Sequence, residues 1–177
     1  MNISNIKISN SLTSPEEFDF YFETIYQTIS QLKEDYPDFN NWYYKKVRDG
    51  IIDGSREIIF TVAWNYIAGV AILKKEKREK KICTLRVFDN FQRNGIGKKL
   101  VIESFDYLHT EEPLITVPSL KEHQFQKMFN FFGFKKRDEL SNYYSFGKKE
   151  VTFNGSLEWE KGSSLLLTLS HDPLLLF

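Results

Sequence analysis

The stretch from residue 82 to residue 108 constrains the fold of this chain more than any other part of its sequence. It begins with the apolar, β-branched run ICTLRV, breaks at a polar turn that holds Gly95 and Gly97, and resumes with apolar residues at helical spacing up to Leu108. This pattern predicts a strand, a glycine-containing loop and a helix in direct succession. The first N–H groups of a helix have no partner within the helix, and the helix dipole adds positive potential there. Because glycine lacks a Cβ, an anion can approach such a loop closely, and the stretch therefore predicts an anion site.

The loop also carries a family motif. Its sequence, QRNGIG over residues 92–97, fits the pattern Q/R-x-x-G-x-G/A, and VFDNF over residues 87–91 precedes it at the matching spacing. In these residues the chain resembles the GNAT superfamily of acyl-CoA-dependent N-acyltransferases. The resemblance implies that the loop holds the pyrophosphate of acetyl-CoA through Gln92, Arg93, Asn94, Gly95, Gly97 and Lys98. It further implies that Leu85, Arg86 and Val87 contact the pantetheine arm and the thioester. An ordinary turn at the start of a helix is the alternative interpretation of the same residues.

Composition limits the class of protein. The chain has 177 residues, 41% of them hydrophobic, which suits one domain with a sizeable core. Its 24 basic and 24 acidic residues leave no net charge, so we expect neither a nucleic-acid partner nor a membrane partner. The single cysteine, Cys83, fits a reducing compartment and is interpreted as a core residue. No signal peptide or apolar stretch of about 20 residues is visible, and a cytoplasmic location is expected.

Two helices are predicted in the first third of the chain. Ser14 and Pro15 are typical of a helix start, and apolar residues then recur at spacings of three and four up to Leu32. A second helix is expected from Asp38 toward Gly50. In the GNAT pattern this helical pair lines one wall of the acceptor site, which makes Trp42 and Tyr43 candidate substrate-binding residues. Packing in the core is the alternative for both side chains.

The remaining elements are predicted from alternation and turns. An antiparallel hairpin is predicted for residues 57–64 and 66–73, and Gly69 within it marks a bulge or a close approach of the backbone to another segment. The charge run at residues 74–81 is interpreted as a solvated hairpin tip. A strand at 114–117, a helix that ends at Gly133, and strands at 143–146 and 150–153 follow. The chain is thus expected to be an α/β (α+β) protein with a single GNAT-type domain. By the resemblance, its mixed, mostly antiparallel sheet has helices on both faces and splayed central strands.

The end of the chain does not fit the minimal fold. Residues 1–158 account for the expected GNAT acyltransferase-like domain, and residues 159–177 form an apolar tail that ends in SSLLLTLSHDPLLLF. Such apolar material is normally buried on the same molecule or on another one. The tail is interpreted as a packing arm or a homodimer contact, with a remnant of cloning as the alternative.

The catalytic residues are the least constrained part of the prediction. Three residues depart from the family motif, Asp89, Phe91 and Gln92, but none of these changes removes a backbone donor. Phe129 stands four residues before Gly133, where many relatives carry the tyrosine that protonates the leaving thiolate. Either another group serves, such as Tyr143 or Tyr144, or the thiolate leaves unassisted, and Tyr143 is the candidate acid. Glu57 is the candidate base, with Glu122 and His123 as alternatives.

Other functional classes are less well supported. The three histidines and one cysteine lack metal-ligand spacing. The loop lacks the G-K-S/T that follows four residues after the first glycine of a P-loop, and it lacks the third glycine of a dinucleotide site. The resemblance therefore implies an N-acetyltransferase that moves an acetyl group from acetyl-CoA to a primary amine of a small molecule or peptide. The alternative is a catalytically weak or inactive GNAT-like module that binds acyl-CoA or a protein partner, and Phe129 favours it. The sequence does not identify the amine.

Overall fold

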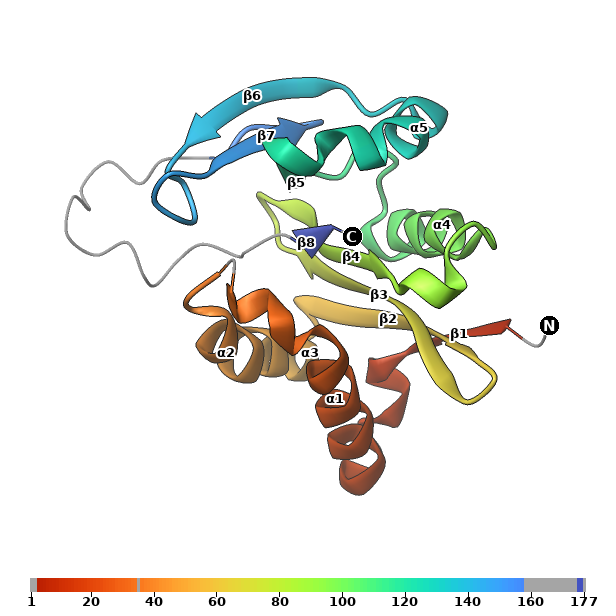
Figure 1. Ribbon diagram of the computed structural model, residues 1–177. Helices are drawn as coiled ribbons and strands as arrows, with labels where there is room; N and C mark the ends of the chain where they lie inside the picture. Colours follow the sequence, from red (N-terminus) through yellow and green to blue (C-terminus); the bar gives the residue numbers. More distant parts are fainter. Residues whose placement is uncertain (1–2, 35, 158–174, 177) are drawn as a thin grey trace.

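The computed structural model describes residues 3–34, 36–157 and 175–176, and its elements follow the predicted order (Figure 1). The strands are β1 (Ile3–Lys7), β2 (Arg56–Ala63), β3 (Tyr66–Lys75), β4 (Lys80–Val87), β5 (Ile115–Pro118), β6 (Lys136–Ser141), β7 (Lys149–Phe153) and β8 (Leu175–Leu176). The helices are α1 (Pro15–Ile29), α2 (Phe39–Asn41), α3 (Arg48–Asp53), α4 (Ile96–Leu108) and α5 (Glu122–Phe132). A π-helical turn, Trp42–Val47, joins α2 to α3.

The strands form two sheets that meet at one point. The first sheet has the order β1-β2-β3-β4-β8 and the second has the order β5-β7-β6. All pairings are antiparallel except that of β4 with β8. Outside these strand pairs, a parallel bridge joins Lys81 of β4 to Leu114, the residue just before β5. The expected mixed, mostly antiparallel sheet with helices on both faces is confirmed.

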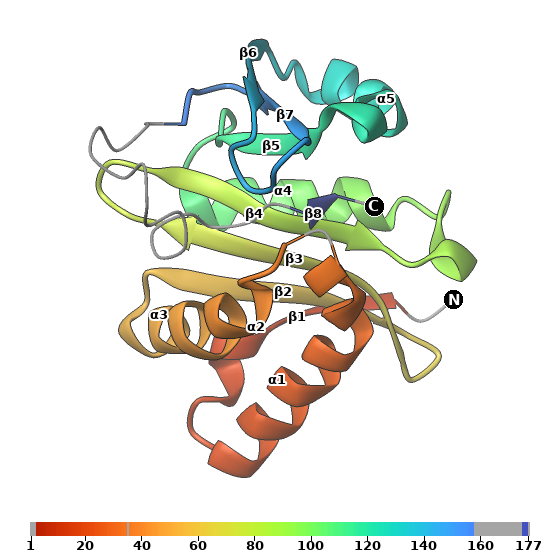
Figure 2. The same ribbon diagram turned by 60° about the vertical axis from the view of Figure 1, so that its left-hand side comes forward.

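The helices cover the first sheet on opposite sides. Helices α1, α2 and α3 lie on one face and α4 lies on the other (Figures 1 and 2). Two apolar clusters correspond to these faces. One cluster joins α1–α3 to Ile58, Phe60 and Ile72 of the sheet. The other cluster joins α4 and α5 to Ile59 and Leu85 and to the inner residues of β5 and β7. Alternate residues of β2 therefore point into different halves of the core, as the twofold period of a strand requires.

Helix α1 forms as its sequence predicts. The Ser14 hydroxyl accepts a hydrogen bond from the N–H of Glu17 at 3.4 Å, and Pro15 occupies the first helical position, where its missing N–H is not needed. The predicted apolar stripe is buried, with Phe22, Ile25 and Ile29 fully inaccessible to solvent. Burial of this face against the sheet supplies most of the stability of such a helix.

Gly69 of β3 lies directly against the first half of α4. The pairing of β2 with β3 shifts register between Thr61 and Val62, opposite Gly69, so the predicted bulge is present. A Cβ at Gly69 would lie 2.9 Å from Cγ2 of Ile96 and 3.0 Å from Cδ1 of Leu100, both in the first half of α4. Glycine is thus required by close approach, and it sets how tightly the start of α4 docks on the sheet.

Two predicted segments differ from the structure. Residues 143–146 are not a strand, because β6 ends at Ser141 and the chain turns before β7. Lys81, expected in a solvated charge run, has only 1% of its surface exposed. The hairpin tip is shorter than the run: Lys74 pairs with Glu76 and Glu79 near the surface, whereas Lys81 already belongs to β4 and lies between the two sheets.

The described part of the tail is β8. It pairs with β4 in parallel, with Thr84 opposite Leu175 and Leu85 opposite Leu176. Residues 158–174 and 177 lie outside the described residues, so the role predicted for the tail as a whole stays a prediction.

Candidate functional site

The loop between β4 and α4 has the backbone conformation of an anion site. After β4 the chain makes a short helical turn, Asp89–Phe91, and α4 begins at Ile96 with Gly95 as its N-cap. Gly95 has a φ of 77° and Arg93 a φ of 62°, which are left-handed conformations. A side chain at Gly95 would meet no atom within 4 Å, so the backbone angle and not crowding explains the glycine. An L-residue in this conformation costs about 1–2 kcal/mol.

The first amides of α4 face outward from the end of the helix. The Gly95 carbonyl accepts a hydrogen bond from the N–H of Lys99 at 3.1 Å, which is the first bond of the helical ladder. The N–H groups of Ile96, Gly97 and Lys98 precede this bond, and helix geometry gives them no partner within α4. These donors and the helix dipole together favour an anion at this point.

Gln92 and Asn94 shape the loop through their own side chains. The Gln92 amide donates to Oδ1 of Asp89 at 2.8 Å and to the Val87 carbonyl at 3.3 Å. The Asn94 amide donates to the carbonyls of Phe91 and Gln92 at 3.2 and 3.1 Å. Both side chains were expected to hold a pyrophosphate. In this structure they hold the loop, which leaves the backbone amides and the neighbouring cationic side chains as donors for a ligand.

A groove of about 690 Å³ leads from this loop along β4 and between α4 and α5. Its lining residues are Leu85, Val87, Gln92, Arg93, Gly95, Ile96, Gly97, Lys98, Gln124, Phe125, Lys127, Met128 and Phe131. The inner end at Leu85, Val87 and Phe125 is apolar, and the outer end carries three cationic side chains. The groove is therefore suited to a long ligand with an apolar arm and an anionic head.

An exposed aromatic ring flanks the anionic end. Phe131 on α5 has 62% of its surface exposed, although it is a large apolar side chain. The Lys98 ammonium lies 3.3 Å from the centre of this ring, a cation–π contact. The groove thus offers a flat apolar face and a positive charge side by side.

Arg86 does not line this groove. Its guanidinium lies 5.0 Å from the ring centre of Phe88, and the Gln31 amide oxygen accepts hydrogen bonds from it. Burial lowers the pKa of Arg86, and the nearby Asp89 opposes this effect. Because neighbouring residues of a strand point to opposite faces, Arg86 faces α1 while Leu85 and Val87 face α4 and α5.

The predicted base is engaged elsewhere. Glu57 is buried, and its carboxylate accepts hydrogen bonds from the hydroxyl and N–H of Ser9 at 2.5 and 3.2 Å and from the N–H of Ile58 at 3.0 Å. Burial raises the pKa of Glu57 and these hydrogen bonds lower it. Glu57 is not among the groove residues, and it fastens the turn after β1 to β2. Its role as a base stays a prediction.

The predicted substrate-binding aromatics belong to the core. Trp42 has 1% and Tyr43 0% of its surface exposed, and the Tyr43 hydroxyl donates to the Phe22 carbonyl at 2.8 Å. Tyr44, on the same turn, is more exposed and donates to Glu23 at 2.9 Å. Helical periodicity turns the first two residues toward the sheet, so in this structure neither presents a surface to an acceptor.

Tyr143, Tyr144 and Phe129 lie in different surroundings. Tyr143 is buried in a small apolar cluster with Leu114 and Leu157. The Tyr144 hydroxyl instead accepts a hydrogen bond from the buried Lys81 ammonium at 3.1 Å. Phe129 is stacked on Phe125 and Phe134, and it does not line the groove. The burial of Lys81 could not be seen in the sequence, because Lys81 is the last residue of a charge run that is typical of a solvent-exposed segment.

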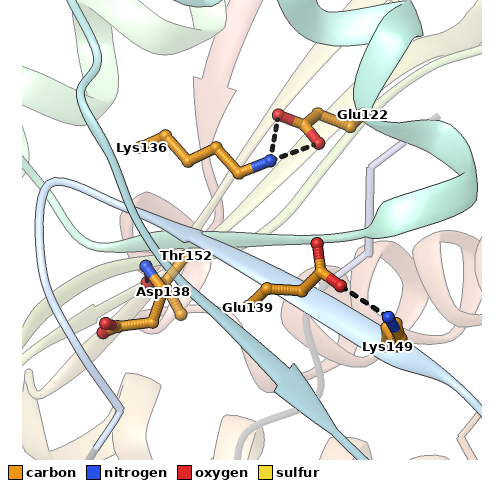
Figure 3. Close-up of polar contacts among 6 residues, drawn as sticks. All are labelled: Glu122, Lys136, Asp138, Glu139, Lys149 and Thr152. Carbon is orange, nitrogen blue, oxygen red and sulfur yellow. Dashed lines mark hydrogen bonds and ion pairs between the residues drawn. The ribbon is translucent and has the colours of Figure 1, made fainter.

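A second groove, of about 450 Å³, lies on the other side of α5. Phe129, Phe134 and Phe153 line it together with polar residues that include His123. Glu122, the other alternative base, also lines it and forms a two-armed ion pair with Lys136 at 3.0 and 2.9 Å, near a second pair between Glu139 and Lys149 (Figure 3). Ion pairs this exposed contribute little to stability.

Among the described residues, no three His, Cys, Asp or Glu side chains are close enough together to hold a metal ion. None of the helices in this part of the chain has the length and apolarity that crossing a membrane requires.

The comparisons with known proteins agree with this geometry. A family model described as an acetyltransferase (GNAT) domain matches residues 27–143, more than half of the chain. A protein described as a GNAT-family acetyltransferase from Desulfovibrio desulfuricans has a TM-score of 0.62 at 11% identity, covering 86% of this chain and 97% of its own. A protein described as a streptothricin acetyltransferase from Bacillus anthracis was solved with acetyl coenzyme A and has a TM-score of 0.52 at 16% identity. The match covers 62% of the present chain and 67% of the Bacillus anthracis protein. A search of curated proteins gave no match. Because the family model covers most of the fold, this chain belongs to the GNAT acetyltransferase family.

Proposed function

We propose that this protein transfers an acetyl group from acetyl-CoA to an amine of a small molecule or peptide, by direct attack in a ternary complex. The observation that carries the proposal is the groove that joins the amide-lined start of α4 to the inner residues of β4. Such a groove matches a donor with a diphosphate at one end and an acyl thioester at the other.

The residues present fit this donor. The N–H groups of Gly97 and Lys98 would bind the diphosphate, with Arg93 and Lys98 adding charge. Leu85 and Val87 would lie along the pantetheine arm, and Phe131 offers a face for the adenine ring. When bound, the donor supplies an activated acyl group. Alignment of the two reactants by the protein can lower the barrier by on the order of 7–11 kcal/mol.

A module that binds acyl-CoA without turnover is the second candidate. Phe129 favours it, because phenylalanine at this helix position cannot protonate a leaving thiolate. Mass spectrometry separates the two candidates: the protein is incubated with acetyl-CoA and a panel of amines that includes polyamines, peptides and streptothricin. We expect one amine or more to gain an acetyl group. Tight binding of coenzyme A with only background hydrolysis across the panel would leave the binding module as the function.

The phosphate site can be tested at Gly97. A Cβ there would lie 3.5 Å from Cγ2 of Val87, which is an ordinary contact, and no left-handed angle is involved. We expect Gly97→Glu to weaken coenzyme A binding by at least about 100-fold, because a carboxylate would face the diphosphate. Gly97→Ala is the matched control and should stay within a few-fold of the wild type. Equal affinities by calorimetry for the wild type and Gly97→Glu would refute the assignment.

The adenine face can be tested at Phe131. Stacking of a base on an aromatic ring is worth about 1–3 kcal/mol, so Phe131→Ala should weaken coenzyme A binding by about tenfold or more. The affinity for 4′-phosphopantetheine, which has no adenine, should not change. Phe146→Ala is the control, since this ring is 94% exposed and lies outside the groove. A similar loss with both ligands would contradict the stacking role.

The pairing of β8 with β4 predicts competition at the inner end of the groove. Leu85 is opposite Leu176, so the backbone edge assigned to the pantetheine arm also carries the C-terminal strand. Proline cannot donate to a strand ladder, and a backbone hydrogen bond contributes about 0.5–1.5 kcal/mol. We therefore expect Leu176→Pro to tighten coenzyme A binding several-fold in calorimetry, while Leu176→Ala, which keeps the amide, should not. Weaker binding in Leu176→Pro would show that β8 supports the site.

A further inference from the structure

Helix α5 separates two grooves that share no lining residue. The larger one, of about 690 Å³, is the groove assigned to the acetyl donor, and we call the smaller one, of about 450 Å³, the second groove. Sites for small molecules commonly have volumes of about 300–1,000 Å³, so the second groove is large enough for one. The proposed donor contacts use none of its residues. The second groove is therefore open to a separate ligand.

Three phenylalanine rings form the apolar part of the second groove. They are Phe129 of α5, Phe134 in the connection to β6, and Phe153 at the end of β7. The ring centre of Phe129 lies 4.4 Å from that of Phe153 and 5.2 Å from that of Phe134. Close packing of the three rings gives a ligand a rigid aromatic surface to contact. A flat aromatic group suits such a surface, because aromatic rings pair favourably in edge-to-face and offset arrangements.

A row of polar side chains forms one wall of this groove. Ser119, His123, Gln126 and Asn130 follow one another at spacings of four, three and four residues, which places them on one helical face. His123, Gln126 and Asn130 are exposed, and within the described part of the chain their side chains form no hydrogen bond to another residue. An imidazole and two carboxamides are thus available to bind the polar groups of a ligand.

An ion pair supplies charges of both signs beside this wall. The Lys136 ammonium of β6 donates to both carboxylate oxygens of Glu122, which begins α5, at 3.0 and 2.9 Å (Figure 3). The side chain of Lys136 is 48% exposed and that of Glu122 is 31% exposed, and ion pairs this accessible contribute little to stability. Opening this pair therefore costs little. A ligand that carries both charges can take the place of each partner.

The charges of the second groove favour a zwitterion over a simple cation or anion. A ligand with a single charge would compete for one member of the ion pair and leave the other without its partner. An α-amino acid carries an ammonium and a carboxylate on the same carbon, so it offers a group to Glu122 and a group to Lys136. An aromatic side chain on that carbon suits the phenylalanine surface.

We propose that the second groove is a binding site for a free aromatic α-amino acid. Glu122 accepts hydrogen bonds from the ammonium of the ligand, and Lys136 donates to its carboxylate. The aromatic ring lies against the phenylalanine surface, and the carboxamides of Gln126 and Asn130 supply further hydrogen bonds. The site is distinct from the donor groove, which lies across α5.

The first test is an NMR titration of the ¹⁵N-labelled full-length chain with L-phenylalanine. We expect saturable shifts of the amides that line the second groove, and we expect L-leucine, which lacks a ring, to bind more weakly. Gln126→Trp should abolish the shifts, because its side chain would fill the groove, while its amide spectrum stays dispersed. No saturable shift with either L-phenylalanine or L-tryptophan up to about 10 mM would overturn the proposal, as would shifts confined to the donor groove.

The second test matches each charge of the ligand to one residue. Lys136→Met should weaken L-phenylalanine binding by about tenfold or more, but it should not weaken binding of phenethylamine, which has no carboxylate. Glu122→Gln should likewise weaken L-phenylalanine binding but not that of 3-phenylpropionate, which has no ammonium.

The control for both substitutions is the neighbouring ion pair. Lys149 donates to Glu139 at 2.8 Å, and neither residue lines the groove (Figure 3). Lys149→Met and Glu139→Gln should leave the affinity for L-phenylalanine unchanged. Unchanged affinity in both Lys136→Met and Glu122→Gln, or equal losses for all three ligands, would contradict the assignment of the charges. Neither test involves coenzyme A, so their failure would leave the proposed acetyl transfer standing.

Discussion

The short contact between β4 and β5 is the constraint on which the site depends. Beyond this contact β4 pairs with β8 and β5 pairs with β7, and Leu85 lines the groove on the side of α4 and α5. One bridge at Lys81 and Leu114 holds the sheets together and lets them diverge. Leu85 and Val87 face α4 and α5 while Arg86 faces α1, because successive residues of β4 alternate between the two faces of the sheet.

The position of α4 depends on close packing behind that groove. Gly69 lets Ile96 and Leu100 reach the sheet, and this contact fixes the start of the helix beside the end of β4. The left-handed Gly95 then turns the chain so that the first amides of α4 lie at the mouth of the groove. Backbone donors fixed in this way bind an anion without ordering a side chain, which lowers the entropy cost of binding.

The order of elements and the anion loop could be predicted from the sequence because their signals are local. The N-cap at Ser14, the alternation in β2 and the glycine that ends α5 are each encoded within a few residues. The buried hydrogen bond from Lys81 to Tyr144 could not be predicted, because the two residues are far apart in the sequence and Lys81 is buried only where β4 meets the residue before β5. Lys81 stands in a charge run that normally marks solvent. Likewise, the sequence allows the side chains of Trp42 and Tyr43 to face either the core or the acceptor site, and only the packing of α2 and α3 on the sheet shows that they face the core.

Amide hydrogen exchange with and without acetyl-CoA tests the central claim most directly, because it reports on the backbone donors at the start of α4. Bound donor should slow exchange of the amides of Gly97 and Lys98 strongly, and that of residues 85–87 as the arm fills the inner groove. Exchange on the α1–α3 side should change much less until an acceptor is added. Unchanged exchange at Gly97 and Lys98 at saturating acetyl-CoA, with protection elsewhere, would contradict the account.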